Sequence, residues 1–164
     1  MNKLIIIRGP SGAGKSTVAN ALMKQVARPT ALFNRDYFMF MFSTEGDGSG
    51  SSPDQDLLEN NILYCLSHGY DVIFEGNFKV DTHKTLLDRI FQTHPDENYI
   101  FYLDVSLDET LDRHSKREEQ LITADEIKGL YDTTTPMGHT SETIIPEHSS
   151  VDETVKFISD KAGL

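Results

Sequence analysis

Residues 4–17 read LIIIRGPSGAGKST, an apolar run that leads directly into a glycine-rich loop. Residues 9–16 of this loop match the phosphate-binding pattern G-x-x-x-x-G-K-[ST] at every fixed position. Such a loop turns successive backbone N–H groups toward phosphate oxygens, and the N-terminus of the next helix adds partial positive charge. The stretch therefore predicts a nucleoside triphosphate site made of Gly9, Pro10, Ser11, Gly12, Ala13, Gly14, Lys15, Ser16 and Thr17.

Two side chains of this loop have expected roles. Lys15 is placed to reach the β- and γ-phosphates, and the Ser16 hydroxyl is placed to ligate Mg²⁺. The alternative is a glycine-rich turn that binds nothing. The strand-like run before the loop and the helical pattern after it argue against that alternative. ATP and Mg²⁺ are therefore the expected ligands.

Composition places the chain among globular proteins. Its 164 residues are 38% hydrophobic and 25% charged, which predicts one domain over residues 1–164. The net charge of −11 lacks the basic surface of a duplex binder but is compatible with a local cationic cleft. With no long apolar segment and a single cysteine, we expect a cytoplasmic protein without a membrane partner.

Strand-like and helical patterns alternate along the whole chain. This alternation predicts an α/β fold in which a parallel sheet carries helices on both faces. A glycine- and serine-rich flexible loop is expected at about 43–53. The expected strands are 4–7, 30–34, 71–75, 99–105 and 143–146, and the helices are 15–26, 53–68, 81–93, 106–117, one opening after Thr123 and one opening after Ser150.

Polar residues follow three of the expected strands, where ligands of parallel sheets bind. Asp36 is the candidate general base for an attacking hydroxyl, and Arg35 is a candidate for substrate binding or a solvated surface arginine. Glu75 is the preferred carboxylate for the metal or the acceptor, with Asp104 as the alternative metal residue. Asn77 is a further candidate for substrate binding.

One cationic cluster, RHSKR at 113–117, stands out in this acidic chain. Its cations are spaced to share a helix face. Arg113 and Arg117 are therefore expected to close over the polyphosphate as part of a lid at about 113–124. The alternative is a set of surface pairs, Glu109 with Arg113 and Asp112 with Lys116.

The segment 37–42 reads YFMFMF. Such a segment belongs either to the core, on a short helix or turn, or to an apolar pocket for the acceptor. The interpretation as core is favoured here.

Four motifs together resemble the small P-loop kinases of the AAA/zeta-toxin-like and polynucleotide 5′-kinase-like group. They are GPSGAGKST at 9–17, NRD at 34–36, VIFEGN at 72–77 and YLDVSLDETLDRHSKR at 102–117. The resemblance implies a three-layer P-loop NTPase fold with strand order 2-3-1-4-5. It also implies that Asp36 is the base and that Arg117 is the lid arginine that stabilises the γ-phosphate.

One position departs from the polynucleotide kinases. They carry an arginine three residues after the base, where this chain has Met39. The expected function is therefore ATP- and Mg²⁺-dependent transfer of the γ-phosphate to a hydroxyl of a small molecule, such as a nucleoside or nucleotide-sugar. Polynucleotide 5′-phosphorylation is the alternative. A nucleotide switch of the GTPase kind would need an N-K-x-D motif, and Asn2-Lys3 continues without the aspartate.

Overall fold

The computed structural model describes residues 1–42, 52–116 and 122–164. Most of the loop expected at 43–53, the expected lid arginine Arg117 and the lid residues up to 121 lie outside the described residues. Within the described ranges, no helix is both long enough and apolar enough to cross a membrane.

Five parallel strands form one sheet in the order β2-β3-β1-β4-β5, which confirms the expected topology. Because all five strands run in the same direction, their carboxyl ends meet at one edge, and polar residues there share a site. The strands are β1 (Leu4–Arg8), β2 (Thr30–Asn34), β3 (Asp71–Gly76), β4 (Asn98–Asp104) and β5 (Glu142–Pro146).

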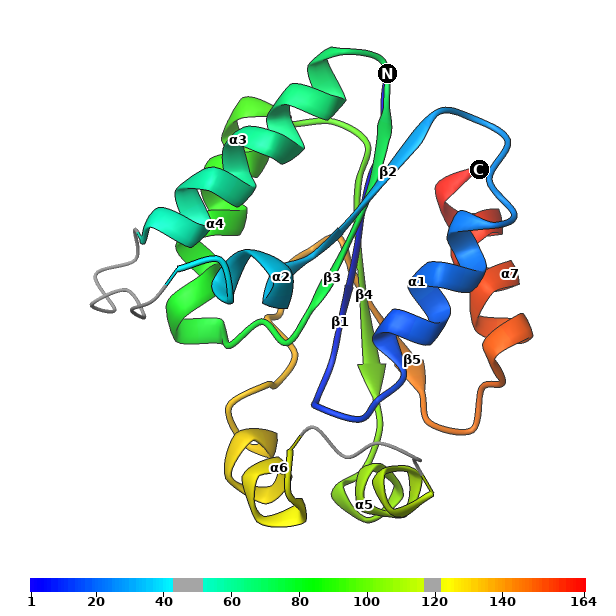
Figure 1. Ribbon diagram of the computed structural model, residues 1–164. Helices are drawn as coiled ribbons and strands as arrows, with labels where there is room; N and C mark the ends of the chain where they lie inside the picture. The colour runs from blue at the N-terminus through cyan, green and yellow to red at the C-terminus, as the bar shows by residue number, and fades with distance from the viewer. Residues whose placement is uncertain (43–51, 117–121) are drawn as a thin grey trace.

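Helices cover both faces of the sheet (Figure 1). Ile5 and Ile7 of β1 pack in one core cluster with α1 (Lys15–Met23) and α7 (Val151–Ala162). The alternate residues Leu4 and Ile6 pack in a second cluster with α3 (Pro53–Ser67) and α4 (Val80–Thr93). Successive strand residues point to opposite faces, so the apolar run is buried on both sides, as the sequence predicts.

Three further helices lie near the carboxyl edge of the sheet. The short helix α2 (Arg35–Met39) follows β2 directly. Helices α5 (Leu107–Ser115) and α6 (Ala124–Tyr131) lie beyond the strand ends, as Figure 1 shows. This edge therefore carries α2, α5, α6 and the start of α1.

Side chains define the N-termini of several helices. Complete capping boxes form at Thr123 and Ser150, as their spacing to a glutamate predicts. Ser106 and Glu109 have the same spacing, which predicts a third box, but only half of it is present. The Ser106 hydroxyl accepts from the Glu109 N–H, but the Ser106 N–H donates to the Glu147 carboxylate after β5. That contact ties the start of α5 to the loop after β5.

Two local predictions at helix ends are wrong. Ser52 and Gln55 have the spacing that predicts a capping box, but no box forms, because the Ser52 hydroxyl bonds to the Asp54 carboxylate instead. Helix α1 ends at Met23 and not at residue 26. The N–H groups of residues 25 and 26 both donate to the Leu22 carbonyl, which forms a turn after the helix.

The interpretation of segment 37–42 as core is also wrong for most of its residues. Phe38 is partly buried and contacts the Phe33 ring at a centroid distance of 5.9 Å. Met39 is also partly buried. The other four large side chains of the segment are exposed, namely Tyr37, Phe40, Met41 and Phe42. A short helix at the edge of a sheet can turn only one side to the core.

Candidate functional site

The glycine-rich loop at 9–17, hereafter the P-loop, joins the end of β1 to the start of α1. Gly9 has a φ of +150°, and a Cβ there would lie 2.7 Å from the Leu103 carbonyl oxygen of β4. Gly14 has a φ of +98° and is the N-cap of α1. Only glycine adopts such backbone angles without strain, so the loop can lie close to β4 and present bare N–H groups at the helix start.

Lys15 is folded back across the P-loop. Its ammonium donates to the Pro10 carbonyl at 2.8 Å, and the residue is only 8% exposed. The loop therefore carries a fixed positive charge where the sequence predicts bound phosphates. This arrangement suits an anion that replaces the carbonyl as a partner of the ammonium.

Glu75 is the residue at which three elements meet. The Ser16 hydroxyl of α1 donates to Glu75 Oε1 at 2.8 Å, and the Asn34 amide at the end of β2 donates to the same oxygen. Burial raises the pKa of the Glu75 carboxyl, while the bond from Ser16 and the charge of Lys15 oppose the shift. The two predicted metal ligands, Ser16 and Glu75, are thus in contact.

The donor set around Ser16 fits Mg²⁺. This ion commonly takes one or two carboxylates together with substrate phosphates, and it keeps several waters. Glu75, and not the exposed Asp104, is the carboxylate bonded to Ser16. Across the described part of the chain, no three His, Cys, Asp or Glu side chains gather into an all-protein metal cage.

Asp36 lies in α2 beside this contact. The Asn34 side chain accepts from the Asp36 N–H at 2.8 Å, so the same residue caps α2 and holds Glu75. An Arg35 guanidinium nitrogen lies 3.4 Å from the Asp36 carboxylate. A Cβ at Gly76 would lie 2.7 Å from the Arg35 Cβ, so α2 packs closely on the end of β3.

The structure thus brings Asp36, Arg35 and Glu75 to one place. Asn77 directly follows β3, and its side-chain oxygen accepts a hydrogen bond from the Thr134 hydroxyl. The Asn77 side chain is therefore already bonded to the segment that connects α6 to β5.

A cavity of about 360 Å³ lies between the P-loop and the loop after β5. Its volume falls within the usual range of small-molecule sites. The lining residues come from the P-loop, α1, the ends of β4 and β5, α5 and the start of α7: Gly12, Ala13, Gly14, Thr17, Val18, Leu103, Val105, Arg113, Ile145, Pro146, Glu147, Ser149, Ser150, Val151 and Thr154.

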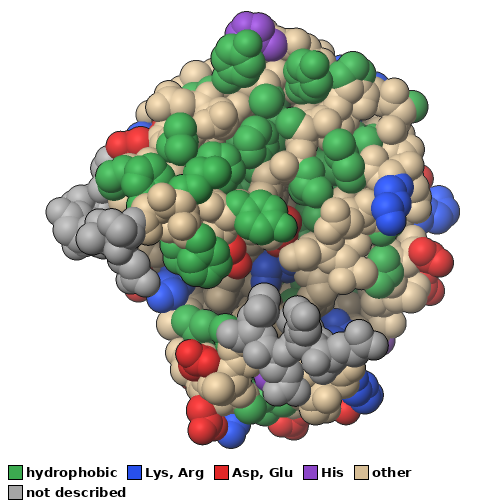
Figure 2. All heavy atoms as spheres, viewed as in Figure 1, with side chains coloured by type: hydrophobic (Ala, Val, Ile, Leu, Met, Phe, Trp, Pro, Cys, Tyr) green, Lys and Arg blue, Asp and Glu red, His purple; other side chains and the backbone are tan. Residues whose placement is uncertain are grey.

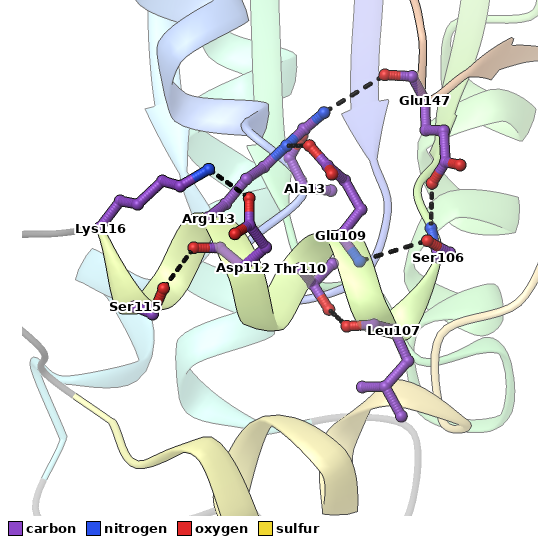
Figure 3. Close-up of polar contacts among 10 residues, drawn as sticks. All are labelled: Ala13, Ser106, Leu107, Glu109, Thr110, Asp112, Arg113, Ser115, Lys116 and Glu147. Carbon is purple, nitrogen blue, oxygen red and sulfur yellow. Dashed lines mark hydrogen bonds and ion pairs between the residues drawn. The ribbon is translucent and has the colours of Figure 1, made fainter.

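Arg113 spans this cavity from α5 (Figure 3). Its guanidinium donates to the Ala13 carbonyl at 3.0 Å and to the Glu147 carbonyl at 3.2 Å. Its Nε donates to Glu109 at 2.6 Å, so the i,i+4 pair considered as the alternative is also present. Lys116 instead pairs with Asp112 on the surface. Of these two cations, only Arg113 therefore contacts the P-loop, while Lys116 is bound to Asp112 on the surface.

Comparison with known proteins places this site in a family. A model of the family described as AAA domain matches residues 4–131. The chain belongs to this AAA domain family. A search of curated proteins finds no match.

Several solved structures similar to this AAA domain are kinases by name. A sugar kinase of Janibacter sp. HTCC2649 superposes with a TM-score of 0.78 at 17% identity, covering 98% of this chain and 94% of its own. The APS kinase of Mycobacterium tuberculosis, solved with AMPPNP and APS, gives 0.78 at 16% identity, covering 99% and 98%. A gluconokinase of Sinorhizobium meliloti 1021 gives 0.73 at 16% identity, covering 98% and 91%. At these identities the likeness shows the fold alone.

Sequence reasoning missed one residue of this AAA domain, Arg8. It is fully buried directly before the P-loop, and its guanidinium lies 2.6 Å from the Glu142 carboxylate. It also donates to the carbonyls of Phe78 and Thr135, at 2.9 and 2.7 Å. The available signal was an arginine that ends an otherwise apolar strand. Arg8 therefore holds together the P-loop, the exit of β3 and the connection before β5.

Replacing Arg8 with methionine is expected to destabilise the AAA domain strongly. The substitution leaves the Glu142 side chain without its buried partner, and removing one member of a buried ion pair typically costs about 3–5 kcal/mol. Urea denaturation measures the free energy of unfolding. Arg8→Met combined with Glu142→Leu should recover most of the loss, because no unpaired carboxylate is left. A single variant within about 1 kcal/mol of the parent would contradict a structural role for the pair.

Proposed function

We propose that this AAA domain is an ATP- and Mg²⁺-dependent phosphotransferase that moves a γ-phosphoryl group to a hydroxyl of a small molecule. The proposal rests on the contact of Ser16 with Glu75. The Asn34 amide donates to the same carboxylate oxygen. Through Asn34, the N-cap of α2, this contact links the P-loop to the helix that carries Asp36. Donor-side and acceptor-side groups thereby lie next to each other.

On the donor side, the P-loop N–H groups and Lys15 bind the polyphosphate. Ser16 and Glu75 would hold Mg²⁺, which when bound offsets the negative charge of the phosphates. The cavity between the P-loop and Glu147 would take the nucleoside, with Arg113 as one wall.

On the acceptor side, the Asp36 carboxylate takes the proton of the attacking hydroxyl. The hydroxyl oxygen forms a bond to the γ-phosphorus, the bond from phosphorus to the β-phosphate oxygen breaks, and ADP leaves. Arg35 and Asn77 flank the acceptor. Arg117, which lies outside the described residues, is proposed to stabilise the γ-phosphate charge, as the resemblance implies.

The names of similar structures support a small-molecule acceptor. Among them are a sugar kinase, a gluconokinase and an APS kinase. The overall charge of −11 and Met39 in place of an arginine point the same way, because a polynucleotide acceptor needs cations for its phosphates.

Replacing Arg113 with alanine is expected to raise the KM for ATP by about tenfold with a smaller change in kcat. The substitution removes a cavity wall and two charge-assisted bonds to backbone carbonyls, each worth about 1.5–3 kcal/mol. Steady-state kinetics with varied ATP measures the effect. Lys116→Ala is the matched control, because Lys116 pairs with Asp112 on the surface. Equal kinetics in the two variants would exclude Arg113 from the ATP site.

Transfer of ³²P from γ-labelled ATP tests the proposed function. The acceptor panel contains nucleosides, sugars, nucleotide-sugars and 5′-hydroxyl oligonucleotides, with the Lys15→Ala protein as the blank. Label in a small alcohol is the expected result. Label in oligonucleotides alone would make the protein a polynucleotide kinase. ATP binding without transfer to any acceptor would contradict the proposal and favour a nucleotide switch.

A further inference from the structure

Four large apolar side chains on and directly after α2 face outward. Tyr37 is 71% exposed and Phe40 is 76% exposed, and Met41 and Phe42 continue the patch. We call these four residues the α2 aromatic face. Figure 2 shows hydrophobic side chains gathered over this part of the molecule, beside a hollow in which acidic and basic side chains are visible. Contiguous exposed apolar groups of this kind mark binding surfaces.

The position of this face is fixed by the inward side of α2. The Phe38 ring packs on the Phe33 ring of β2, and the Asn34 side chain caps the helix. Close packing of Arg35 on Gly76 holds the helix against the end of β3. The exposed aromatic rings are therefore presented by an anchored helix.

The α2 aromatic face lies directly beside the proposed base. The Phe40 N–H donates to the Asp36 carbonyl at 3.0 Å, so the two residues are one helical turn apart and share a side of α2. Asn34 joins this helix to Glu75, which in turn contacts Ser16. When a substrate hydroxyl lies at Asp36, the rest of the substrate therefore lies next to Phe40.

We infer that the acceptor is an uncharged alcohol whose hydroxyl is carried on an apolar, ring-containing body. This inference rests on the proposed function and names its substrate class. Aromatic side chains gain free energy of binding from burying such an apolar body and from offset or edge-to-face ring contact.

A stacked nucleobase is the competing occupant, because exposed aromatic rings also bind bases. A base arrives with phosphates that need cations. In the described segment 35–42 the one cation is Arg35, and its guanidinium already contacts Asp36. The charge of segment 35–42 itself therefore favours the neutral alcohol.

The test compares two diols that differ only in the group on their ether oxygen, 3-phenoxypropane-1,2-diol and 3-methoxypropane-1,2-diol. In ³²P transfer from ATP, kcat/KM is expected to be at least tenfold higher for the phenoxy diol. The double variant Tyr37→Ser/Phe40→Ser should remove this preference and leave the KM for ATP unchanged. Tyr64→Ser is the matched control, because Tyr64 is 62% exposed on α3 and stacks on His68.

A binding measurement separates this inference from the proposed function. Saturation-transfer NMR with 3-phenoxypropane-1,2-diol should show ring signals in the parent and the Tyr64→Ser protein, but not in the double variant. Ring signals without transfer to any alcohol would support the apolar site while the kinase proposal fails. Equal transfer to both diols, unchanged in the double variant, would overturn the inference while the kinase proposal stands.

Two further results would also overturn it. One is transfer to oligonucleotides alone, lost in the double variant, which would assign the α2 aromatic face to a nucleobase. The other is a parent protein that sediments as a dimer and a double variant that sediments as a monomer, which would assign the face to a second copy of this chain.

Discussion

Lys15→Ala is expected to lose ATP binding and to reduce phosphoryl transfer by about 10³-fold or more. The ammonium lies over the P-loop, 2.8 Å from the Pro10 carbonyl, and is almost fully enclosed. It is the charge that would bridge two phosphates, and each charge-assisted hydrogen bond contributes about 1.5–3 kcal/mol. Alanine leaves the backbone cradle but removes the cation. Isothermal titration with AMP-PNP and single-turnover kinetics measure the two effects.

The control for this prediction is Lys84→Ala. Lys84 is an exposed lysine on α4 that pairs with Asp88, away from the loop. Both variants should keep the circular dichroism spectrum of the parent. Parent-like turnover in Lys15→Ala would show that the glycine-rich loop does not hold a reacting triphosphate, and the proposed function would fall with it.

Asp36→Asn is expected to keep ATP affinity within about twofold and to lose phosphoryl transfer by at least ~100-fold, the usual magnitude of general acid–base catalysis. Asparagine has nearly the same size as aspartate, and the bond that caps α2 uses the backbone N–H of residue 36. The substitution should therefore remove the proton acceptor and leave the helix in place. Single-turnover transfer to the acceptor identified by the panel, together with AMP-PNP titration, separates chemistry from binding.

Asp104→Asn is the matched control for Asp36→Asn, because Asp104 ends β4 and is exposed. It should transfer phosphate like the parent. Undiminished transfer in Asp36→Asn would place the base elsewhere. Glu75 would then be the next candidate, tested by Glu75→Gln, because burial raises the pKa of its carboxyl and so makes the carboxylate a stronger proton acceptor.

Local features of this protein were predictable where the chemistry lies within a few consecutive residues. The P-loop is one such feature, because an apolar strand, three glycines and a lysine carry their signal within residues 4–17. Capping boxes at Thr123 and Ser150 are others. The strand order came from the resemblance to P-loop kinases and not from the pattern of strands itself.

Predictions failed where exposure depends on surrounding elements. The sequence of 37–42 shows that its residues are apolar, but it does not show what covers them. The structure leaves Tyr37 and Phe40 at the surface because α2 is short and lies at the sheet edge. Their exposure beside Asp36 is what makes them candidates for contact with the acceptor.

By itself, the sequence determined the triphosphate loop, the alternating strands and helices, and the candidate residues at the strand ends. Only the tertiary structure decided which of these residues meet. Ser16 bonds to Glu75 across 59 positions of chain, Arg113 reaches Ala13 across 100, and Arg8 pairs with Glu142 across 134. Such contacts depend on how parallel strands order themselves and on which loops their ends bring together, and no local pattern encodes that arrangement.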